Sequence, residues 1–473
     1  MRSGLDKTTS PLTATILLTF LGVLIVTGVN LLDPMVRHDD FPALLAEPTG
    51  YYTKTLYEGR WINYLWHLRG VVTPSWLNYL IYQLSWAIYA SCVAHLALGV
   101  RGPLWHRVAL ALLITLGPPA LLISLWFNTL VPGLGLVALY AWLCTQLSER
   151  ASRRLLLVFV PLTLMTYTTY PLFLLVICLV RADTQRSFRD LVGLLALFVA
   201  SFALGMIAIF TLNQFAHGVF GVPMAPWRNG TPAHDLASAL ENTRALGVFF
   251  YETARVAGFG SMPLAWANLA MLAVASVFVG REDPWRVLYA LSALVVGLGL
   301  VFVQTVKSGI TLPVRVNGFS WAIYAVLLTL MVAQLSRQGG LPERLCRNLL
   351  LFVVLAYMAG SIKQYIIYRA WQGQTWDIAQ QIGSGPEPLL VTGTYKSLVE
   401  ADRAGIQKPR GLRLRLTYLT GRTVFTCEEK PERCAALPPE VLADLSPGET
   451  AIARHDGQVI LRLSSQEVST RNR

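Results

Sequence analysis

Between Leu155 and Val180 the chain reads LLLVFVPLTLMTYTTYPLFLLVICLV, and the topology of the whole protein depends on how this run is interpreted. The run is apolar, but Pro161 and Pro171 interrupt it, and the polar sequence TYTT, residues 166–169, lies near its centre. Because proline disrupts a helix interior, such a run forms either one long membrane span or a hairpin of two short ones. The two alternatives place every later loop on opposite sides of the membrane.

The composition predicts a multi-pass membrane protein. Of the 473 residues, 54% are hydrophobic and only 14% are charged, which is too apolar for a soluble chain of this length. The net charge of +12 would suit a nucleic acid, but the basic residues are scattered between apolar runs. We therefore predict no nucleic-acid partner. The other runs predicted to span are Leu12–Leu32, Trp76–Gly99, Val108–Leu122, Leu130–Leu147, Leu191–Leu212, Pro263–Gly280, Val287–Val303, Gly318–Leu335 and Leu349–Tyr368.

Loop charge separates the two alternatives, because cytoplasmic loops retain Lys and Arg. With a cytoplasmic N-terminus and a hairpin at 155–180, every short inner loop contains at least two arginines. These inner loops are 101–107, 148–154, 181–190, 280–286 and 336–348. A single span would turn the last three of them outward. We therefore predict an all-α polytopic protein of about eleven transmembrane helices, with its C-terminus on the outer side.

The chain after residue 368 is less apolar and predicts a second domain. We assign residues 1–368 to a transmembrane domain with outer loops 33–74 and 213–262, and residues 369–473 to a small extracytoplasmic domain. The letters GLRLRLTYLTGRTVFT from Gly411 and ETAIARHDGQVILRLSS from Glu449 alternate like strands. Asp456-Gly457 in the second stretch is a hairpin turn signal. The domain is therefore predicted to be α/β or β-rich.

Two of the six cysteines lie in this C-terminal region. Cys427 and Cys434 are predicted to form a local disulfide, whereas the other four lie in or beside apolar runs. A disulfide would place the region in an oxidising compartment.

The first outer loop contains an acidic pair in the sequence RHDDF, Arg37 to Phe41. One interpretation is purely structural, in which Asp40 caps a short helix beginning near Phe41. A second carboxylate and His38 are not needed for a cap, however. Adjacent carboxylates near a low-dielectric boundary repel each other, which favours protonation of one and suits a general base.

The same loop continues as GYYTKTLYEGRWINYLWHL, Gly50 to Leu68. Its aromatic residues are typical of an interfacial amphipathic helix. An arginine within such a helix needs an anionic partner, which for Arg60 would be Asp39, Asp40 or a phosphate. Glu58 is the third charged residue of this motif.

The double-Asp motif Asp39-Asp40, followed by Gly59-Arg60-Trp61 in a chain of about eleven spans, resembles the GT-C superfamily of integral-membrane glycosyltransferases. More narrowly, the chain resembles the O-antigen glucosyltransferase family of bacterial lipopolysaccharide loci. The topological likeness extends from Met1 to about Tyr368. That family often has an arginine shortly after its acidic pair, whereas FPALL follows here.

The resemblance implies a sugar, glucose in that family, carried on a polyprenyl phosphate and transferred outside the bacterial inner membrane. The partners would be this lipid-linked donor, a cell-surface glycan or lipid-linked acceptor, and membrane lipid. Asp40 would act as the general base and Asp39 would orient it or a neighbouring group. The further residues predicted to bind substrate are His38, Glu58, Arg60, Tyr167, Tyr170, Lys307 and Arg315.

Each of these assignments has a simpler alternative. Lys307 and Arg315 flank a short outer loop, where they would meet a lipid phosphate or extend to the membrane surface as ordinary interfacial cations. Tyr167 and Tyr170 at the hairpin apex would line the sugar site or serve as interfacial aromatics.

No cofactor is predicted with certainty. His38, Asp39 and Asp40 are residue types that bind divalent metals, but no second cluster with ligand spacing accompanies them, so a closed metal site is not predicted. Two other functions remain open: a polysaccharide polymerase or ligase that uses a lipid-diphosphate donor, and a lipid or solute transporter. A transporter would carry functional charges inside its spans.

Overall fold

The computed structural model describes residues 10–99, 102–228, 230–435 and 437–468 and divides into two compact units. The first unit contains the described residues up to Val26, Pro48–Arg69 and Asn78–Ser361. The second contains Thr27–Glu47, Gly70–Leu77 and the described residues from Ile362 onward. Arg101 of the first predicted inner loop lies outside the described residues.

Eight helical segments in the described part of the chain are long and apolar enough to cross a membrane. They make this a mostly helical, multi-pass membrane protein. The segments are Pro11–Asn30 (α1 Pro11–Thr27 with η1 Gly28–Asn30), α4 Ser75–Leu98, Pro118–Gln146 (α6 Pro118–Ile123, η3 Ser124–Trp126 and α7 Phe127–Gln146), α11 Phe188–His217, α14 Met262–Glu282, α15 Pro284–Ser308, Val314–Ser336 (η4 Val314–Asn317 with α16 Gly318–Ser336) and α17 Gly340–Ile382.

The predicted count of about eleven is not confirmed, because three expected spans are short helices. The run 155–180 divides into α9, Leu156–Leu164, and α10, Tyr170–Val180. At 1.5 Å per residue each covers only about half of a 30 Å hydrocarbon core. The expected span 108–122 is also wrong in its bounds: α5, Leu104–Thr115, ends before Pro118 and Pro119, which start the separate helix α6.

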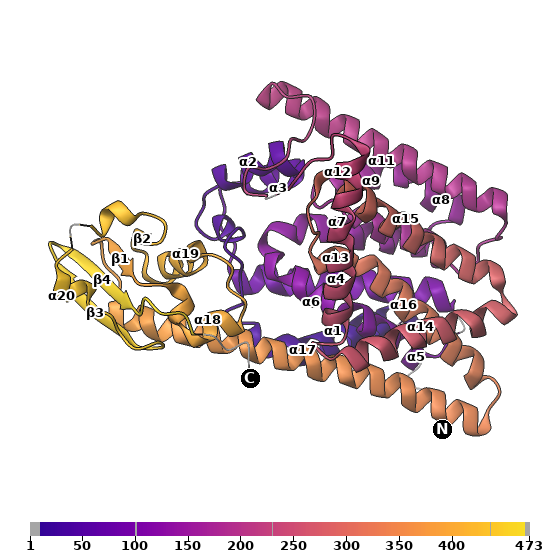
Figure 1. The fold of residues 1–473 in the computed structure, drawn as a ribbon. Coiled ribbons are helices and arrows are strands. Elements are labelled where there is room, and N and C mark those ends of the chain that lie inside the picture. The colour runs from indigo at the N-terminus through magenta and orange to yellow at the C-terminus, as the bar shows by residue number, and fades with distance from the viewer. Residues whose placement is uncertain (1–9, 100–101, 229, 436, 469–473) are drawn as a thin grey trace. The chain divides into compact units, whose positions relative to one another are not determined.

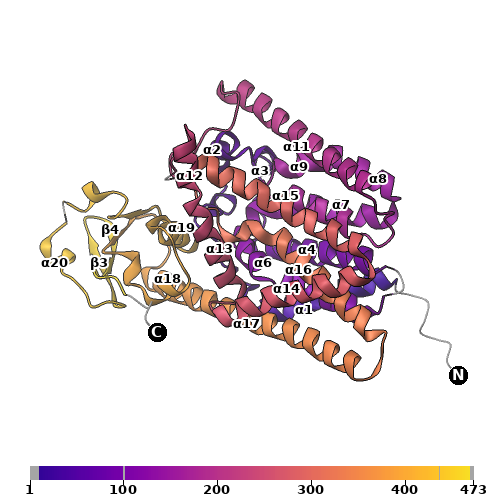
Figure 2. The ribbon, with the colours of Figure 1, turned by 45° about the vertical axis from the view of Figure 1, so that its right-hand side comes forward.

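The centre of the first unit is α16. Its span is 89% buried inside the protein, whereas that of α14 is 22% buried. α16 packs on α5, α10, α14 and α15, and the indole N–H of Trp321 donates to the Leu113 carbonyl at 2.8 Å. α9 and α11 lie side by side at the periphery (Figures 1 and 2). The exposed apolar faces of the outer helices are the surface that lipid would cover.

Short helices lie between the spans. The first predicted outer loop forms η2 (Phe41–Ala43) in the second unit, and α2 (Thr49–Glu58) and α3 (Trp61–His67) in the first. The second predicted outer loop forms α12 (Leu236–Asn242) and α13 (Arg244–Ala257). α8, Glu149–Arg154, joins α7 to α9.

The second unit contains a four-stranded sheet with the order β2-β1-β4-β3 (Figure 1). β1 pairs in parallel with both β2 and β4, and β3 and β4 form the antiparallel hairpin that Asp456-Gly457 predicts. Asp456 and Gly457 both have positive φ, as a two-residue hairpin turn requires. The strands are β1 Leu389–Thr392, β2 Val424–Thr426, β3 Thr450–His455 and β4 Gln458–Leu463.

The strand expected over 411–420 is wrong. Those residues form the helix α19, Pro409–Thr420, which begins at a proline and ends before Gly421 in the left-handed conformation. Leu412 and Leu416, four residues apart, are both buried, so the leucines fit a helical face as well as an alternating strand. The remaining helical elements of this unit are η5 Tyr395–Ser397, α18 Val399–Arg403, η6 Pro431–Arg433 and α20 Pro439–Leu442.

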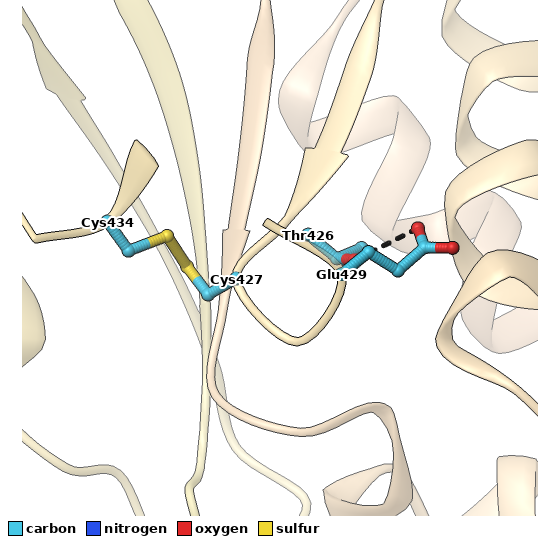
Figure 3. The surroundings of a disulfide bond; sticks show 4 residues. All are labelled: Thr426, Cys427, Glu429 and Cys434. Atoms are coloured by element: carbon cyan, nitrogen blue, oxygen red, sulfur yellow. Dashed lines mark hydrogen bonds between the residues drawn. A yellow bond between two sulfur atoms is a disulfide. The ribbon is translucent and has the colours of Figure 1, made fainter. Parts of the chain in front are cut away.

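Cys427 and Cys434 form a disulfide immediately after β2 (Figure 3). Their Cα atoms are 5.8 Å apart, and Cys434 is buried with Leu390 and Ile460 in a small core. Just before the loop that the disulfide closes, the Thr426 hydroxyl donates a hydrogen bond to the Glu429 carboxylate at 3.2 Å.

Candidate functional site

The acidic pair lies in the second unit, just before η2. Asp40 occupies the position preceding Phe41, yet its side chain makes no capping hydrogen bond. Its main chain forms the turn instead: the Asp40 N–H donates to the Arg37 carbonyl at 3.0 Å. Asp40 is fully buried and Asp39 is half-buried. Asp40 is therefore the N-cap residue of η2 by position, as the structural interpretation expects, and its carbonyl accepts from the Ala43 N–H at 3.2 Å, but its side chain adds no capping hydrogen bond.

The residues around the pair are also enclosed. Arg37 is 8% exposed, and its guanidinium donates to the Gly405 carbonyl at 2.5 Å. His38 is half-buried and lines a narrow cavity together with Gln372 and Arg415. Several polar side chains thus face the loop that carries the two carboxylates.

A second cluster, in the first unit, joins Glu58 to two arginines. The Arg60 Nε lies 2.7 Å from one oxygen of Glu58, and an Arg228 nitrogen lies 3.2 Å from the other. Only 12% of the Glu58 side chain and 14% of the Arg60 side chain are exposed. We call Glu58, Arg60 and Arg228 the Arg–Glu–Arg cluster. It joins two arginines to one carboxylate, and arginine is the side chain best suited to bind a phosphate.

Gly59 gives this cluster its geometry. It ends α2 in the left-handed conformation at φ +68°, and the Arg60 N–H donates to the Lys54 carbonyl at 3.3 Å. A Cβ atom at Gly59 would lie 2.9 Å from the Ile209 side chain. The position therefore requires glycine both for its backbone and for its close packing against α11.

The apex of the α9–α10 hairpin lies beside this cluster. The Arg60 guanidinium is 5.1 Å from the ring centre of Tyr167, which is 5.3 Å from that of Tyr170. Main-chain carbonyls at the apex accept hydrogen bonds from the start of α3: Met165 from the Ile62 N–H at 3.2 Å, and Thr166 from the Asn63 amide at 2.9 Å. Four of the residues predicted from sequence, Glu58, Arg60, Tyr167 and Tyr170, are therefore adjacent.

Lys307 and Arg315 have different surroundings. Lys307 is exposed at the end of α15, and its carbonyl accepts a hydrogen bond from Ala233, in the segment that also carries Arg228. Arg315 lies over the Trp126 ring at 4.0 Å. The structure thus places Lys307 on the side of the first unit that carries Arg228 and gives Arg315 an aromatic partner.

Arg228 and Lys54 also belong to this part of the first unit, but the sequence did not identify either as a candidate site residue. Arg228 is 170 positions from Glu58, so no local pattern connects them. Lys54 lies one helical turn before Glu58 and is 8% exposed, with its ammonium 5.7 Å from the Tyr51 ring. Its spacing of four residues from Glu58 is the only signal that could have identified it.

Tyr51 also stacks on His67, with ring centres 4.0 Å apart and an interplanar angle of 12°. Burial, together with the charges of Arg69 and Lys54, lowers the pKa of His67 to about 3. Its buried Nε2 makes no hydrogen bond to any described residue. His67 is therefore neutral at physiological pH and serves as a packing ring.

This pKa predicts a pH dependence of stability. Between pH 6.5 and about 3 the unfolded chain binds a proton at His67 and the folded chain does not. Stability should fall as pH falls through this window, by at most about 1.4 kcal/mol per pH unit. His67→Phe keeps the stacking ring and should reduce the loss, measured as unfolding temperature in detergent at pH 7.5 and 4.5. His234→Phe, at an exposed histidine, is the control, and an unchanged loss in His67→Phe would contradict the assignment.

Three of the predicted inner loops lie at one end of the first unit. Arg153 makes two hydrogen bonds to Asp190, at 2.5 and 2.8 Å, and Arg186 pairs with Asp283 at 3.0 Å. These ion pairs connect loops 148–154, 181–190 and 280–286. These three basic loops therefore lie together, as a hairpin at 155–180 requires.

The described residues contain no group of three or more His, Cys, Asp or Glu side chains that could hold a metal ion. Comparison with known proteins finds no matching family, no similar curated protein and no similar solved structure.

Proposed function

We propose that this protein is a glycosyltransferase that moves a single sugar from a polyprenyl-phosphate donor to a cell-surface glycan or lipid-linked acceptor. The reaction would occur at the extracytoplasmic face of the bacterial inner membrane, with the basic loops in the cytoplasm. The observation that carries the proposal is that the Asp40 carboxylate is completely buried in the loop before η2, next to a second, half-buried carboxylate, Asp39.

The proposed chemistry assigns one role to each cluster. The acceptor hydroxyl oxygen attacks the anomeric carbon of the donor sugar and its proton passes to the Asp40 carboxylate. The bond from that carbon to the phosphate oxygen breaks, and its electron pair leaves with the polyprenyl phosphate. Arg60 and Arg228 provide positive charge for the phosphate. Tyr167 and Tyr170 provide aromatic surface for the sugar.

Transfer by the purified protein in lipid nanodiscs tests this proposal. We expect product from a polyprenyl-monophosphate sugar and none from the matching diphosphate. Mass spectrometry of surface glycan from cells with and without the protein should show the loss of a hexose branch. A loss of chain length instead, or activity only with the diphosphate donor, would favour a polymerase or ligase and contradict the proposal.

A further inference from the structure

We call residues 33–41, which carry Asp39 and Asp40, the acidic loop. This loop belongs to the same compact unit as the C-terminal α/β fold, and the first residue through which it is held there is Asp33. Arg415 of α19 donates to both carboxylate oxygens of Asp33, at 2.7 and 2.5 Å. Arg415 is 5% exposed, and its Nε also donates to the Thr375 hydroxyl at 3.2 Å. A buried, bidentate arginine of this kind fixes both the position and the direction of its partner.

Three further contacts hold the loop, two of them before the acidic pair and one directly after it. The Gln372 side chain donates to the Asp33 carbonyl, and Arg37 donates to the carbonyl of Gly405, just before α19. The Phe41 ring lies 6.3 Å from that of Tyr418, also on α19. The anchors at positions 33, 37 and 41 therefore enclose Asp39 and Asp40.

We propose that the C-terminal α/β unit holds the acidic loop in place, and that Arg415 is a positioning residue for Asp40. Arg415 acts through Asp33 and does not take part in the reaction. Loss of its charge would leave the Asp33 carboxylate without its bidentate partner, which is costly for a partly buried ion pair. The loop would loosen, and a displacement of about 1 Å at a reacting group costs up to about 10²-fold in rate.

The test uses Arg415→Gln in the full-length protein in nanodiscs. Hydrogen exchange of the peptide covering residues 35–45 should accelerate at least about tenfold, while exchange in β1 and β4 stays unchanged. The kcat for transfer should fall about 10- to 100-fold with little change in the KM for the donor. Adding Asp33→Asn removes the carboxylate that Arg415→Gln leaves with only the long ion pair to Arg369, at 3.8 Å. This second change should restore part of the exchange protection and part of the kcat. The matched control is Arg413→Gln, because Arg413 lies on the same helix and pairs with Glu429 near the surface.

The inference rests on the proposed function only in calling the loop catalytic. Different experimental outcomes would therefore reject the loop-holding role of Arg415 and the glycosyltransferase activity. Unchanged exchange of residues 35–45 in Arg415→Gln would overturn the inference, as would accelerated exchange throughout the α/β unit, since Arg415 would then be a general stabilising residue. Local acceleration in a protein whose wild type transfers no sugar would support the holding role and reject the glycosyltransferase.

Discussion

Asp40→Asn should lower the rate of sugar transfer by about 10²- to 10⁴-fold, the usual contribution of a general base. The change keeps the size of the side chain and removes its ability to accept the proton of the acceptor hydroxyl. Because Asp40 is buried and its main chain forms the turn before η2, the amide should fit the same space. The measurement is the initial rate in nanodiscs at saturating donor and acceptor, with size-exclusion elution as the check on folding.

Two comparisons make this result specific. Asp39→Asn should cause a smaller loss, since Asp39 is assigned an orienting role. Asp444→Asn should leave the rate unchanged, because the Asp444 carboxylate accepts surface hydrogen bonds from Ser465 at 2.8 and 2.6 Å. Wild-type rates from Asp40→Asn would remove Asp40 from the mechanism.

Arg60→Gln should weaken binding of polyprenyl phosphate by about 10- to 100-fold, the range expected for a lost hydrogen bond to a charged group. Arg228→Gln should cause a smaller loss, because 35% of the Arg228 side chain is exposed. Glu58→Gln should act in the opposite direction and strengthen binding. It removes the negative charge that now competes with the phosphate for both guanidinium groups.

The opposite effects of Arg60→Gln and Glu58→Gln on polyprenyl-phosphate binding distinguish a phosphate site from a purely structural ion pair. If the Arg–Glu–Arg cluster only stabilised the fold, Glu58→Gln and Arg60→Gln would both destabilise it and neither would strengthen binding. Arg255→Gln is the matched control, because Arg255 pairs with Glu252 on the exposed helix α13. Native mass spectrometry of the protein with polyprenyl phosphate measures the affinities, and weaker binding by Glu58→Gln would count against the assignment.

Hydrophobic run length and loop charge predicted most of the first unit. The long spans were found because each needs its own apolar residues, and the break at 155–180 follows from Pro161, Pro171 and the polar letters between them. The prediction of a single span over 108–122 was wrong because hydropathy alone does not show that Pro118 and Pro119 start a new helix. The hairpin at Asp456-Gly457 was predicted correctly because these two adjacent residues determine the turn by themselves.

The candidate site was only partly predictable. Glu58 and Arg60 are close in sequence, so their pairing has a local cause, whereas Arg228 reaches Glu58 only through the folded chain. The position of Arg415 could not be predicted for a different reason. The alternation of arginine and leucine around it suggested a strand, and a strand has no helical face on which Arg415 and Leu412 lie together.

The shortness of α9 and α10 constrains any exchange of the first outer loop between proteins. Peptide groups at the apex, Met165 to Thr169, need hydrogen-bond partners within the protein wherever water is excluded. The Ile62 amide and the Asn63 side chain occupy two of their carbonyls. A grafted loop that lacks these two donors would leave the Met165 and Thr166 carbonyls without these hydrogen bonds, so a working chimera must keep both donors along with any new specificity.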